Sequence, residues 1–319
     1  MENQIFESIA PVIRKSKHVR INKENIKTAC SQFNLGEAKY WMAESPYDLS
    51  GLSDSQKLNF IFVFGSINFC YWGSPKWTVE YRGAQYDGAW GMIACMGKAI
   101  EAGIPLLSAG YLSSLGESDF ARIVAGAVPI PLFSERLCIL KEQGRILEEK
   151  YQGQFLNVVK QADNDALRLL NIIVDEFPSF DDSATYHNQK VLFYKRAQLA
   201  VSDVFRTFAG TGFGNLKNIS QLTAFADYKI PQTLRKLGIL EYAPELAEKI
   251  DRKIQILLNS EEEIEIRAQM IWAIELMKKE LQKKNPCITS MDVDSYVWLL
   301  GQDKSPDDKP YHLTRTVFY

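Results

Sequence analysis

The chain has 319 residues, of which 46% are hydrophobic, and its formal net charge is −2 at pH 7. This length accommodates one large domain or two ordinary ones, and the apolar fraction is sufficient for a sizeable core. The near-neutral charge excludes the strongly basic composition of a general nucleic-acid-binding protein. It remains compatible with a local basic patch that binds a single phosphate group.

The cysteines and the N-terminus indicate a compartment. The five cysteines are widely scattered, their number is odd and none forms a CxxC pair, so we expect reduced thiols in a cytoplasmic protein. The first residues lack the basic and apolar regions of a signal peptide. The longest apolar run, residues 60–65, is too short to span a bilayer. We therefore expect no membrane partner.

The N-terminal third combines helical and β patterns. Residues 5–45 are typical of polar helices. Residues 59–65 are a short apolar run between turn signals, which predicts a buried strand. Residues 76–86 predict an antiparallel hairpin whose loop contains Gly83. A helix is expected from Gly88 to about residue 102, where the following glycine and proline end it.

From residue 117 onward the pattern is almost wholly helical. Residues 137–151 predict an amphipathic helix, and residues 186–208 predict the clearest helix of the chain. On a helical wheel, Lys195 and Arg206 fall opposite the apolar face of that second helix.

Two further helices and an aromatic tail complete the chain. Ser260 and Glu263 have the spacing of a capping box, which predicts that a helix begins there. A last helix is expected over residues 291–300, and it places Asp294 and Trp298 on one face. The tail, residues 310–319, is rich in aromatic residues and is expected to dock on the body of the protein.

These elements predict a mainly α fold with a small antiparallel β-hairpin in the N-terminal third. No internal repeat or low-complexity linker divides the sequence. We therefore expect one compact unit over residues 1–319. A division into two lobes, residues 1–115 with mixed α/β structure and residues 116–319 with helices, is the alternative.

The strongest candidate for chemistry is Asp227. Pro231 disfavours a helical conformation at the preceding residue and is well suited to begin a helix. Asp227 is therefore expected in a break between two helices, beside Phe225 and Tyr228. A carboxylate in such an aromatic break can have an altered pKa and face a cleft. The alternative is a solvated turn aspartate that caps the next helix.

Other chemical signatures are absent or weak. The chain has no phosphate-binding GxxxxGK[ST] motif and no HExxH motif. Its glycine-rich residues 210–214 lack a preceding strand and the dinucleotide spacing, which favours a helix-ending loop. The three histidines are far apart in the sequence, so no metal site is expected. Trp72, Trp77 and Trp90 are compatible with a core or with the wall of a pocket for a flat ring.

Several blocks along the chain resemble one family, the queuosine salvage proteins, which are queuosine 5′-phosphate N-glycosylase/hydrolases. The resemblance extends over most of the chain beyond residue 50. The family pattern places a histidine after a tryptophan near the N-terminus, whereas this chain has Trp-Met-Ala-Glu-Ser-Pro at residues 41–46. The similar blocks are residues 67–72, 79–90, 99–105, 193–198, 222–231 and 265–268, with Asp294, Trp298 and the aromatic ending.

The resemblance implies a reaction, an architecture and a catalytic residue. The reaction is hydrolysis of queuosine 5′-monophosphate to queuine and ribose 5-phosphate, with no metal or organic cofactor. From the near-neutral charge we also expect no stable nucleic-acid partner. The architecture is helical and similar to that of DNA glycosylases. The residue that matches the catalytic carboxylate is Asp227.

The chemistry of this substrate suggests further contacts. The flat base favours aromatic stacking, its cationic amine favours a carboxylate, and the phosphate favours Lys or Arg. Lys195 is the first candidate for the phosphate and Arg315 the second. We expect the base to contact Phe225, Tyr228, Asp294, Trp298, Trp72 and Asp303, and the phosphate and ribose to contact Lys195, Arg315 and Trp90.

Two other classes of function are compatible with the pattern. One is a helical protein that binds a modified nucleobase or RNA without catalysis, although the neutral charge disfavours wide RNA contact. The other is an enzyme similar to DNA glycosylases, although no basic stripe for duplex DNA follows any predicted helix. An aspartate among aromatic residues favours catalysis over binding alone.

Overall fold

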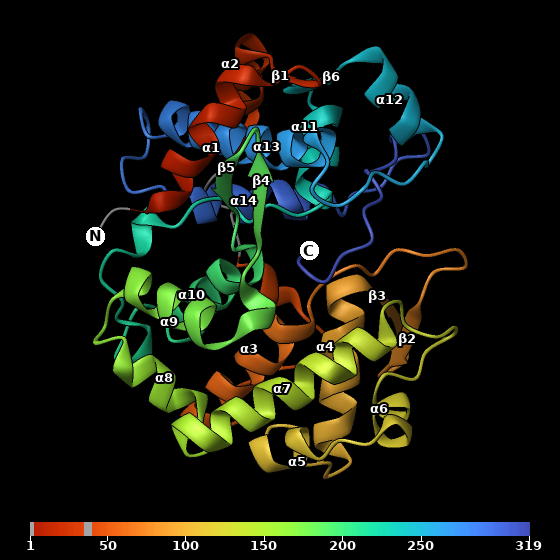
Figure 1. Ribbon diagram of the computed structural model, residues 1–319, viewed down its shortest axis with the longest axis vertical. Coiled ribbons are helices and arrows are strands. Elements are labelled where there is room, and N and C mark those ends of the chain that lie inside the picture. The colour runs from red at the N-terminus through yellow and green to blue at the C-terminus, as the bar shows by residue number, and fades with distance from the viewer. Residues whose placement is uncertain (1–2, 35–39) are drawn as a thin grey trace.

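The computed structural model describes residues 3–34 and 40–319, and within them the fold is mainly helical, as predicted (Figure 1). The α-helices are α1 (Gln4–Lys15), α2 (Lys23–Gln32), α3 (Asp54–Ile67), α4 (Gly88–Glu101), α5 (Ala109–Ser113), α6 (Glu117–Ile123), α7 (Phe133–Tyr151), α8 (Phe155–Gln161), α9 (Ala166–Glu176), α10 (Lys195–Thr207), α11 (Lys229–Lys236), α12 (Pro244–Asp251), α13 (Glu261–Leu281) and α14 (Ser290–Leu300).

The strands form small antiparallel sheets of two strands each in the described part of the chain. The pairs are β1 (Val19–Ile21) with β6 (Leu240–Tyr242), β2 (Thr78–Tyr81) with β3 (Ala84–Asp87), and β4 (Ser183–Tyr186) with β5 (Gln189–Leu192). Short 3-10 helices lie at Trp41–Glu44, Pro178–Phe180, Gly212–Gly214 and Ile219–Gln221. The predicted β2–β3 hairpin and the helix from Gly88 are confirmed.

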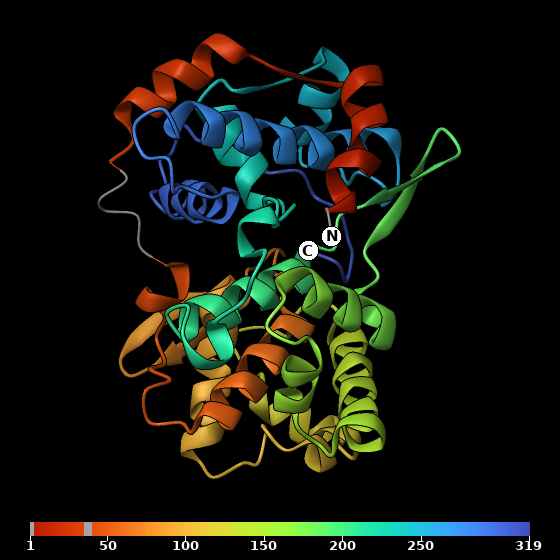
Figure 2. The same cartoon turned by 90° about the vertical axis from the view of Figure 1, so that its left-hand side faces the viewer.

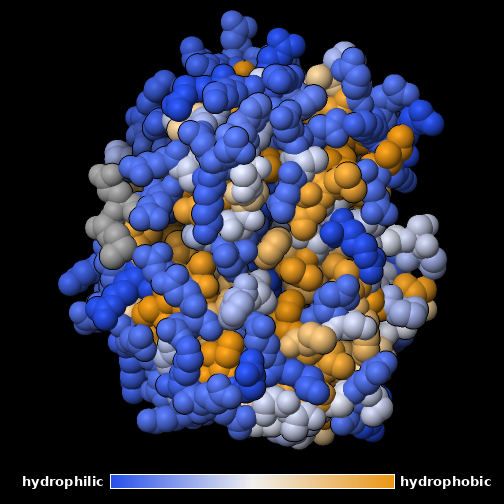
Figure 3. Space-filling model, in the orientation of Figure 1, coloured by the Kyte–Doolittle hydropathy of each residue, from blue (hydrophilic) through white to orange (hydrophobic). Residues whose placement is uncertain are grey.

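Two hydrophobic cores organise the molecule. The first core lies among α3 to α10 in the lower half of Figure 1, and the second core surrounds α13 in the upper half. Figure 2 shows the same two groups of helices from the side, with the C-terminus between them. On the face shown in Figure 3, hydrophobic side chains gather in the middle and lower half, while the top is almost wholly hydrophilic.

The two cores do not divide the chain at residue 115. The first core contains residues between 41 and 225 and also Met291, and the second contains residues 5–30 together with residues from 184 onward. The reason is that α1 and α2 pack against α13, which brings the N-terminus to the C-terminal helices. Neither core is therefore a continuous segment of the sequence.

The strand predicted at residues 59–65 is wrong, because these residues lie inside α3. Every residue from Leu58 to Ile67 is buried at the centre of the first core. A helix that is apolar on all sides is a buried helix, and a short apolar run does not distinguish it from a strand. The helix begins with a capping box, in which Ser53 and Gln56 exchange side-chain to backbone hydrogen bonds.

The helix predicted over residues 186–208 begins only at Lys195. The preceding residues form the β4–β5 hairpin, whose two turn residues, His187 and Asn188, have φ of 47° and 65°. Two positive φ values in a two-residue loop are typical of a type I′ turn. The almost wholly helical pattern predicted beyond residue 117 therefore missed this hairpin and β6.

The second core contains a buried ionic network centred on Arg267 of α13. Its guanidinium donates to both carboxylate oxygens of Asp182, at 2.9 and 2.5 Å, and to the backbone oxygen of Ala226 at 3.3 Å. It also pairs with Glu263. Ser260 caps α13 as predicted, but the Glu263 carboxylate accepts from the backbone of Asn259 instead of completing a capping box.

The aromatic tail docks on the body, as predicted. The backbone oxygen of Tyr319 accepts a hydrogen bond from the backbone N–H of Cys70 in the first core. Its phenol donates to Glu263 in the second core at 2.7 Å. The tail therefore bonds to both groups of helices.

His312, within this tail, is buried, and neither of its ring nitrogens has a hydrogen-bond partner in the described part of the chain. Burial lowers its pKa from 6.5 to about 3, and Arg267 acts in the same direction. Between those values the unfolded chain binds a proton that the folded chain does not, so stability falls as the pH is lowered through this window.

We expect His312→Phe to remove this acid sensitivity. At pH 5 the histidine should cost about 2 kcal/mol of the free energy of unfolding, from the difference in pKa. Denaturant unfolding of both proteins at neutral pH and near pH 5 measures the effect. Equal losses of stability in the wild type and the variant would show that His312 does not cause it.

All five cysteines are free thiols. Among the described residues, no helix combines the length and apolar character that crossing a bilayer requires.

Candidate active site

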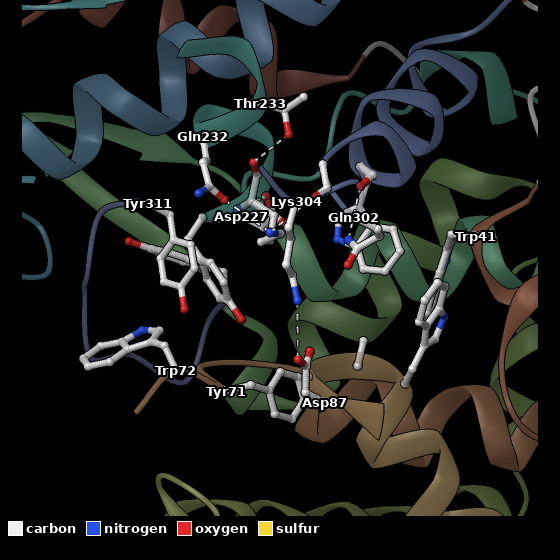
Figure 4. A pocket seen from close by; sticks show the side chains of 18 of the residues that line it. Trp41, Tyr71, Trp72, Asp87, Asp227, Gln232, Thr233, Gln302, Lys304 and Tyr311 are labelled. Carbon is white, nitrogen blue, oxygen red and sulfur yellow. Dashed lines mark hydrogen bonds and ion pairs between the residues drawn. The ribbon is translucent and has the colours of Figure 1, made fainter. Parts of the chain in front are cut away.

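A cavity of about 500 Å³ lies between the two cores, a size typical of small-molecule sites. It is lined by first-core residues such as Phe69 and Tyr71, by α11 and α14, and by the loop that follows α14. Figure 4 shows these side chains converging on one space from elements distant in the sequence. Phe225 belongs to the first core and Ala226 to the second, so Asp227 follows directly at their boundary.

Asp227 is fixed in the cavity wall at the start of α11. Its Oδ1 atom accepts from the backbone N–H groups of Lys229 and Ile230, at 2.9 and 2.8 Å. The aspartate thus caps the helix, as the alternative interpretation expected, but it is buried rather than solvated. Burial raises the pKa of Asp227, against the opposing charge of Lys195. Both hydrogen bonds end on Oδ1, which leaves Oδ2 for a ligand.

Lys195 and Asp294 lie beside Asp227 in the interior. All three side chains are buried and line the cavity. Burial raises the pKa of Asp294 well above its usual value, and the negative charge of Asp227 adds to the effect. Burial lowers the pKa of Lys195, while Asp227 and Asp294 oppose this. The ammonium group of Lys195 therefore interacts with the carboxyl groups of both Asp227 and Asp294. Of these two, Asp294 keeps its proton to a higher pH.

Backbone contacts position this interior group. The Oδ2 atom of Asp294 accepts from the backbone N–H of Phe225 at 2.8 Å. Asp182 accepts from the backbone N–H of Lys195 at 3.1 Å and is itself held by Arg267. Since Arg267 also donates to the oxygen of Ala226, one buried arginine fixes the segments that carry Lys195 and Asp227.

Aromatic side chains line two sides of the cavity, with Trp41 on one side and Tyr311 on the other (Figure 4). The ring of Trp298 is 5.6 Å from the rings of Trp41 and Trp90, with both pairs in edge-to-face geometry. Tyr228 packs against Tyr311, 4.8 Å between ring centroids. These side chains line the cavity, and such a lining suits a flat base. Trp77 is fully buried in the first core, with its indole donating to Val124.

Two tryptophans of the cavity lining, Trp72 and Trp90, have buried indole N–H groups. The indole nitrogens of Trp72 and Trp90 are buried and have no acceptor among the residues that the structure describes. Both side chains line the cavity. Because an unpaired buried donor is costly, these N–H groups are suited to acceptor atoms of a bound molecule.

The Trp41 side chain is fixed by a hydrogen bond to a buried carboxylate. Its indole donates to Asp203 of α10 at 3.2 Å, and the Tyr40 hydroxyl donates to the same oxygen at 2.9 Å. Burial raises the pKa of Asp203 to about 7. This contact fixes the orientation of Trp41 in the cavity wall.

The mouth of the cavity is rich in lysine. Lys76, Lys229 and Lys304 come from three distant parts of the sequence and converge near Asp87. The Asp87 carboxylate pairs with Lys76 and, at 3.6 Å, with Lys304 (Figure 4). Lys236 and Lys309 also line the cavity. The cavity therefore has an interior with a carboxylate and aromatic rings, and a cationic mouth.

The family model described as queuosine salvage protein matches residues 50–319 of the chain. The protein belongs to this family. It is 44% identical over 261 residues to a protein of Sphaerobacter thermophilus named queuosine 5′-phosphate N-glycosylase/hydrolase, covering 82% of this chain and 81% of that one. Relatives of the same name in Mus musculus and Nematostella vectensis are 35% and 33% identical, covering 98% and 100% of this chain and the same shares of the relatives.

Most residues that the sequence singled out in this queuosine salvage protein meet in the one cavity. The exception is Arg315, a candidate for the phosphate, which is exposed and is not part of the lining. Lys195, the other phosphate candidate, lines the cavity in its interior rather than at the mouth. The predicted site residues that line the cavity are Asp227, Phe225, Tyr228, Asp294, Trp298, Trp72, Asp303, Lys195 and Trp90.

The cationic mouth of the cavity and part of its aromatic lining were not predicted from the sequence. Lys229 directly follows the aromatic segment around Asp227, which was a usable signal. Lys76, Lys304 and Tyr311 carry no such signal, because only the tertiary fold brings them together. Trp41 lines the wall in the segment where the family pattern places a histidine.

One cluster away from the cavity has the spacing of metal ligands. His18, Glu261 and Glu265 place ligand atoms within 4.8 Å of one another. The Glu265 carboxylate, however, already accepts from the Ser16 hydroxyl, the Tyr186 hydroxyl and two backbone N–H groups. These bonds join the turn after α1 to α13, and we assign the cluster a structural role.

Proposed function

We propose that this queuosine salvage protein hydrolyses the N-glycosidic bond of queuosine 5′-phosphate. Water adds to C1′ as the bond from C1′ to the base nitrogen breaks, the base takes up the proton, and the products are queuine and ribose 5-phosphate. The relatives carry the name of this activity. The observation that carries the proposal is the buried Asp227, with Oδ1 fixed by two backbone N–H groups in an aromatic cavity.

Asp227 supplies the negative charge that the reaction needs. Loss of the base builds positive charge on the sugar, and a carboxylate stabilises that charge or attacks C1′. Because the two backbone N–H groups fix Oδ1, Oδ2 needs little reorganisation when the charge develops. This chemistry supports Asp227, the residue to which the resemblance pointed, as the catalytic carboxylate.

Lys195 and Asp294 complement Asp227. We infer that Lys195 keeps Asp227 ionised against the effect of burial, instead of binding phosphate as the sequence suggested. Asp294 has a strongly raised pKa and serves the base as a hydrogen-bond donor when protonated. A donor is useful here, since queuine is a 7-deazaguanine and lacks the N7 atom that purine hydrolases can protonate.

The two ends of the cavity suit the two ends of a nucleotide. The base is placed against Trp298, Trp90 and Trp41, and the phosphate at the lysine-rich mouth. Because both cores line the cavity, we propose that residues 1–319 act as a single catalytic unit. The five free thiols support a reducing compartment such as the cytoplasm.

A substrate panel tests this function. Purified protein is incubated with queuosine 5′-phosphate, queuosine, guanosine 5′-phosphate and duplex DNA containing a damaged base, and released bases are separated by chromatography. We expect queuine from queuosine 5′-phosphate with an equal amount of ribose 5-phosphate. Tight binding without release would indicate a binding protein, and base release from DNA alone would indicate a DNA glycosylase.

A further inference from the structure

Asp87 occupies an unusual position at the mouth of the cavity. It lies at the end of β3, directly before α4, on the side of the first core. Its Oδ2 atom contacts Lys76, and it lies 3.6 Å from the ammonium of Lys304, in the loop after α14. The ion pair with Lys304 joins the two sides of the cavity (Figure 4).

The surroundings of Asp87 carry an excess of positive charge. Lys76, Lys304 and Lys229 all act on its carboxyl and, with the burial effect opposing them, hold its pKa below the usual value. The ammonium of Lys229 is kept in place by Gln232 and by the backbone oxygen of Gly301, both at 3.2 Å. Asp227 and Asp308 also act on Lys229, but Lys195 and Lys236 accompany these carboxylates, so five ammonium groups face three carboxylates and the excess is two.

This excess matches a phosphate monoester, which carries a charge of about −1.5 to −2 near pH 7. Asp87 is an anion that screens these lysines from one another. A phosphate that enters the same place meets the lysines and also the negative carboxylate. At such separations like charges repel, and the repulsion weakens as the groups become more exposed to solvent.

We propose that Asp87 is an internal anion that occupies the lysine cluster and competes with the phosphate of the substrate. Asp87 thereby lowers the affinity for every phosphorylated ligand, and its ion pair with Lys304 is released when phosphate binds. The identity of the substrate rests on the proposed function, whereas the competition itself concerns any phosphate monoester.

The test is the substitution Asp87→Asn with ribose 5-phosphate as the ligand. Asp87 is the N-cap residue of α4 but makes no side-chain capping bond, and asparagine is a favoured N-cap, so the variant should fold. Calorimetry should show about a tenfold lower Kd for ribose 5-phosphate in the variant, and no change for ribose. The difference should shrink at high salt, because these groups are partly exposed.

Two further variants serve as controls. Glu101→Gln removes one negative charge from the other end of α4, where Glu101 pairs with Arg82, outside the cavity lining. It should leave the Kd unchanged. Lys304→Gln should weaken binding of ribose 5-phosphate severalfold, because it removes one of the three ammonium groups.

Several results would overturn the proposal. If Asp87 only orients Lys76, Asp87→Asn binds ribose 5-phosphate more weakly. An unchanged Kd, or no binding by either protein, also contradicts it. Binding is measured without turnover, so the outcome is independent of the hydrolysis assay: tighter binding by the variant stands even if no queuine is released.

Discussion

Asp227→Asn should lose about 10²–10³ of turnover, the typical effect of removing one electrostatic stabiliser of a transition state. The amide keeps the shape of the side chain and can still accept from Lys229 and Ile230, so α11 should retain its cap. It lacks the negative charge that the cationic sugar requires. KM should stay similar or fall, and steady-state kinetics on queuosine 5′-phosphate separate the two parameters.

A matched control exists in the same chain. Asp165 caps α9 in the same manner, accepting from the backbone N–H groups of Leu167 and Arg168, but it does not line the cavity. Asp165→Asn should turn over like the wild type. If folded Asp227→Asn protein also stays within a few-fold of the wild type, another carboxyl group carries the reaction, and Asp294 becomes the candidate.

Lys195→Met should shift the pH dependence of turnover. The charge of Lys195 lowers the pKa of Asp227, which burial raises. Without that opposite charge the pKa of Asp227 rises further. Less Asp227 is then ionised at neutral pH, so turnover falls there and recovers as the pH is raised. The pH profile of kcat measures the shift of its acid limb.

The nucleoside provides the internal control for Lys195. If Lys195 acts on Asp227, the turnover of the variant should fall by the same factor on queuosine as on queuosine 5′-phosphate, provided that both are hydrolysed. A loss confined to the phosphorylated substrate, with an unmoved acid limb, would instead show that Lys195 binds phosphate.

Local sequence rules correctly placed Asp227 in a break before a helix, because the signal for that break is local. The proline four residues after Asp227 and the aromatic residues around it predict a helix break, and α11 begins only two residues beyond it. Asp294 and Trp298 share one turn of α14 and do meet in the cavity. Spacing along one helix is preserved in any tertiary arrangement.

The cationic mouth had no comparable signal. Lys76, Lys229 and Lys304 belong to a loop, a helix start and another loop, which only the meeting of the two cores brings together. Each lysine alone is indistinguishable from a solvated surface residue. The phosphate was consequently assigned to Lys195 and Arg315, of which one lies in the interior and the other outside the lining.

The secondary-structure predictions were wrong where burial determines the sequence pattern more strongly than helical periodicity does. The residues of α3 are apolar on all sides because the helix is central to the first core, which removes the helical period from its sequence. The β4–β5 hairpin was merged with α10 because its apolar residues continue the pattern of that helix. The turn at His187 and Asn188 was the signal that separates them.

Single-turnover release of queuine tests the central role of Asp227 most directly. Enzyme in excess over queuosine 5′-phosphate is quenched at increasing times, and free queuine is measured by chromatography, for the wild type and for Asp227→Asn. Circular dichroism and substrate binding are measured on the same samples. We predict complete release by the wild type, and a variant that is folded and binds substrate but releases queuine at least about a hundredfold more slowly. Release by folded Asp227→Asn at the wild-type rate would contradict the assignment of Asp227 as the catalytic carboxylate.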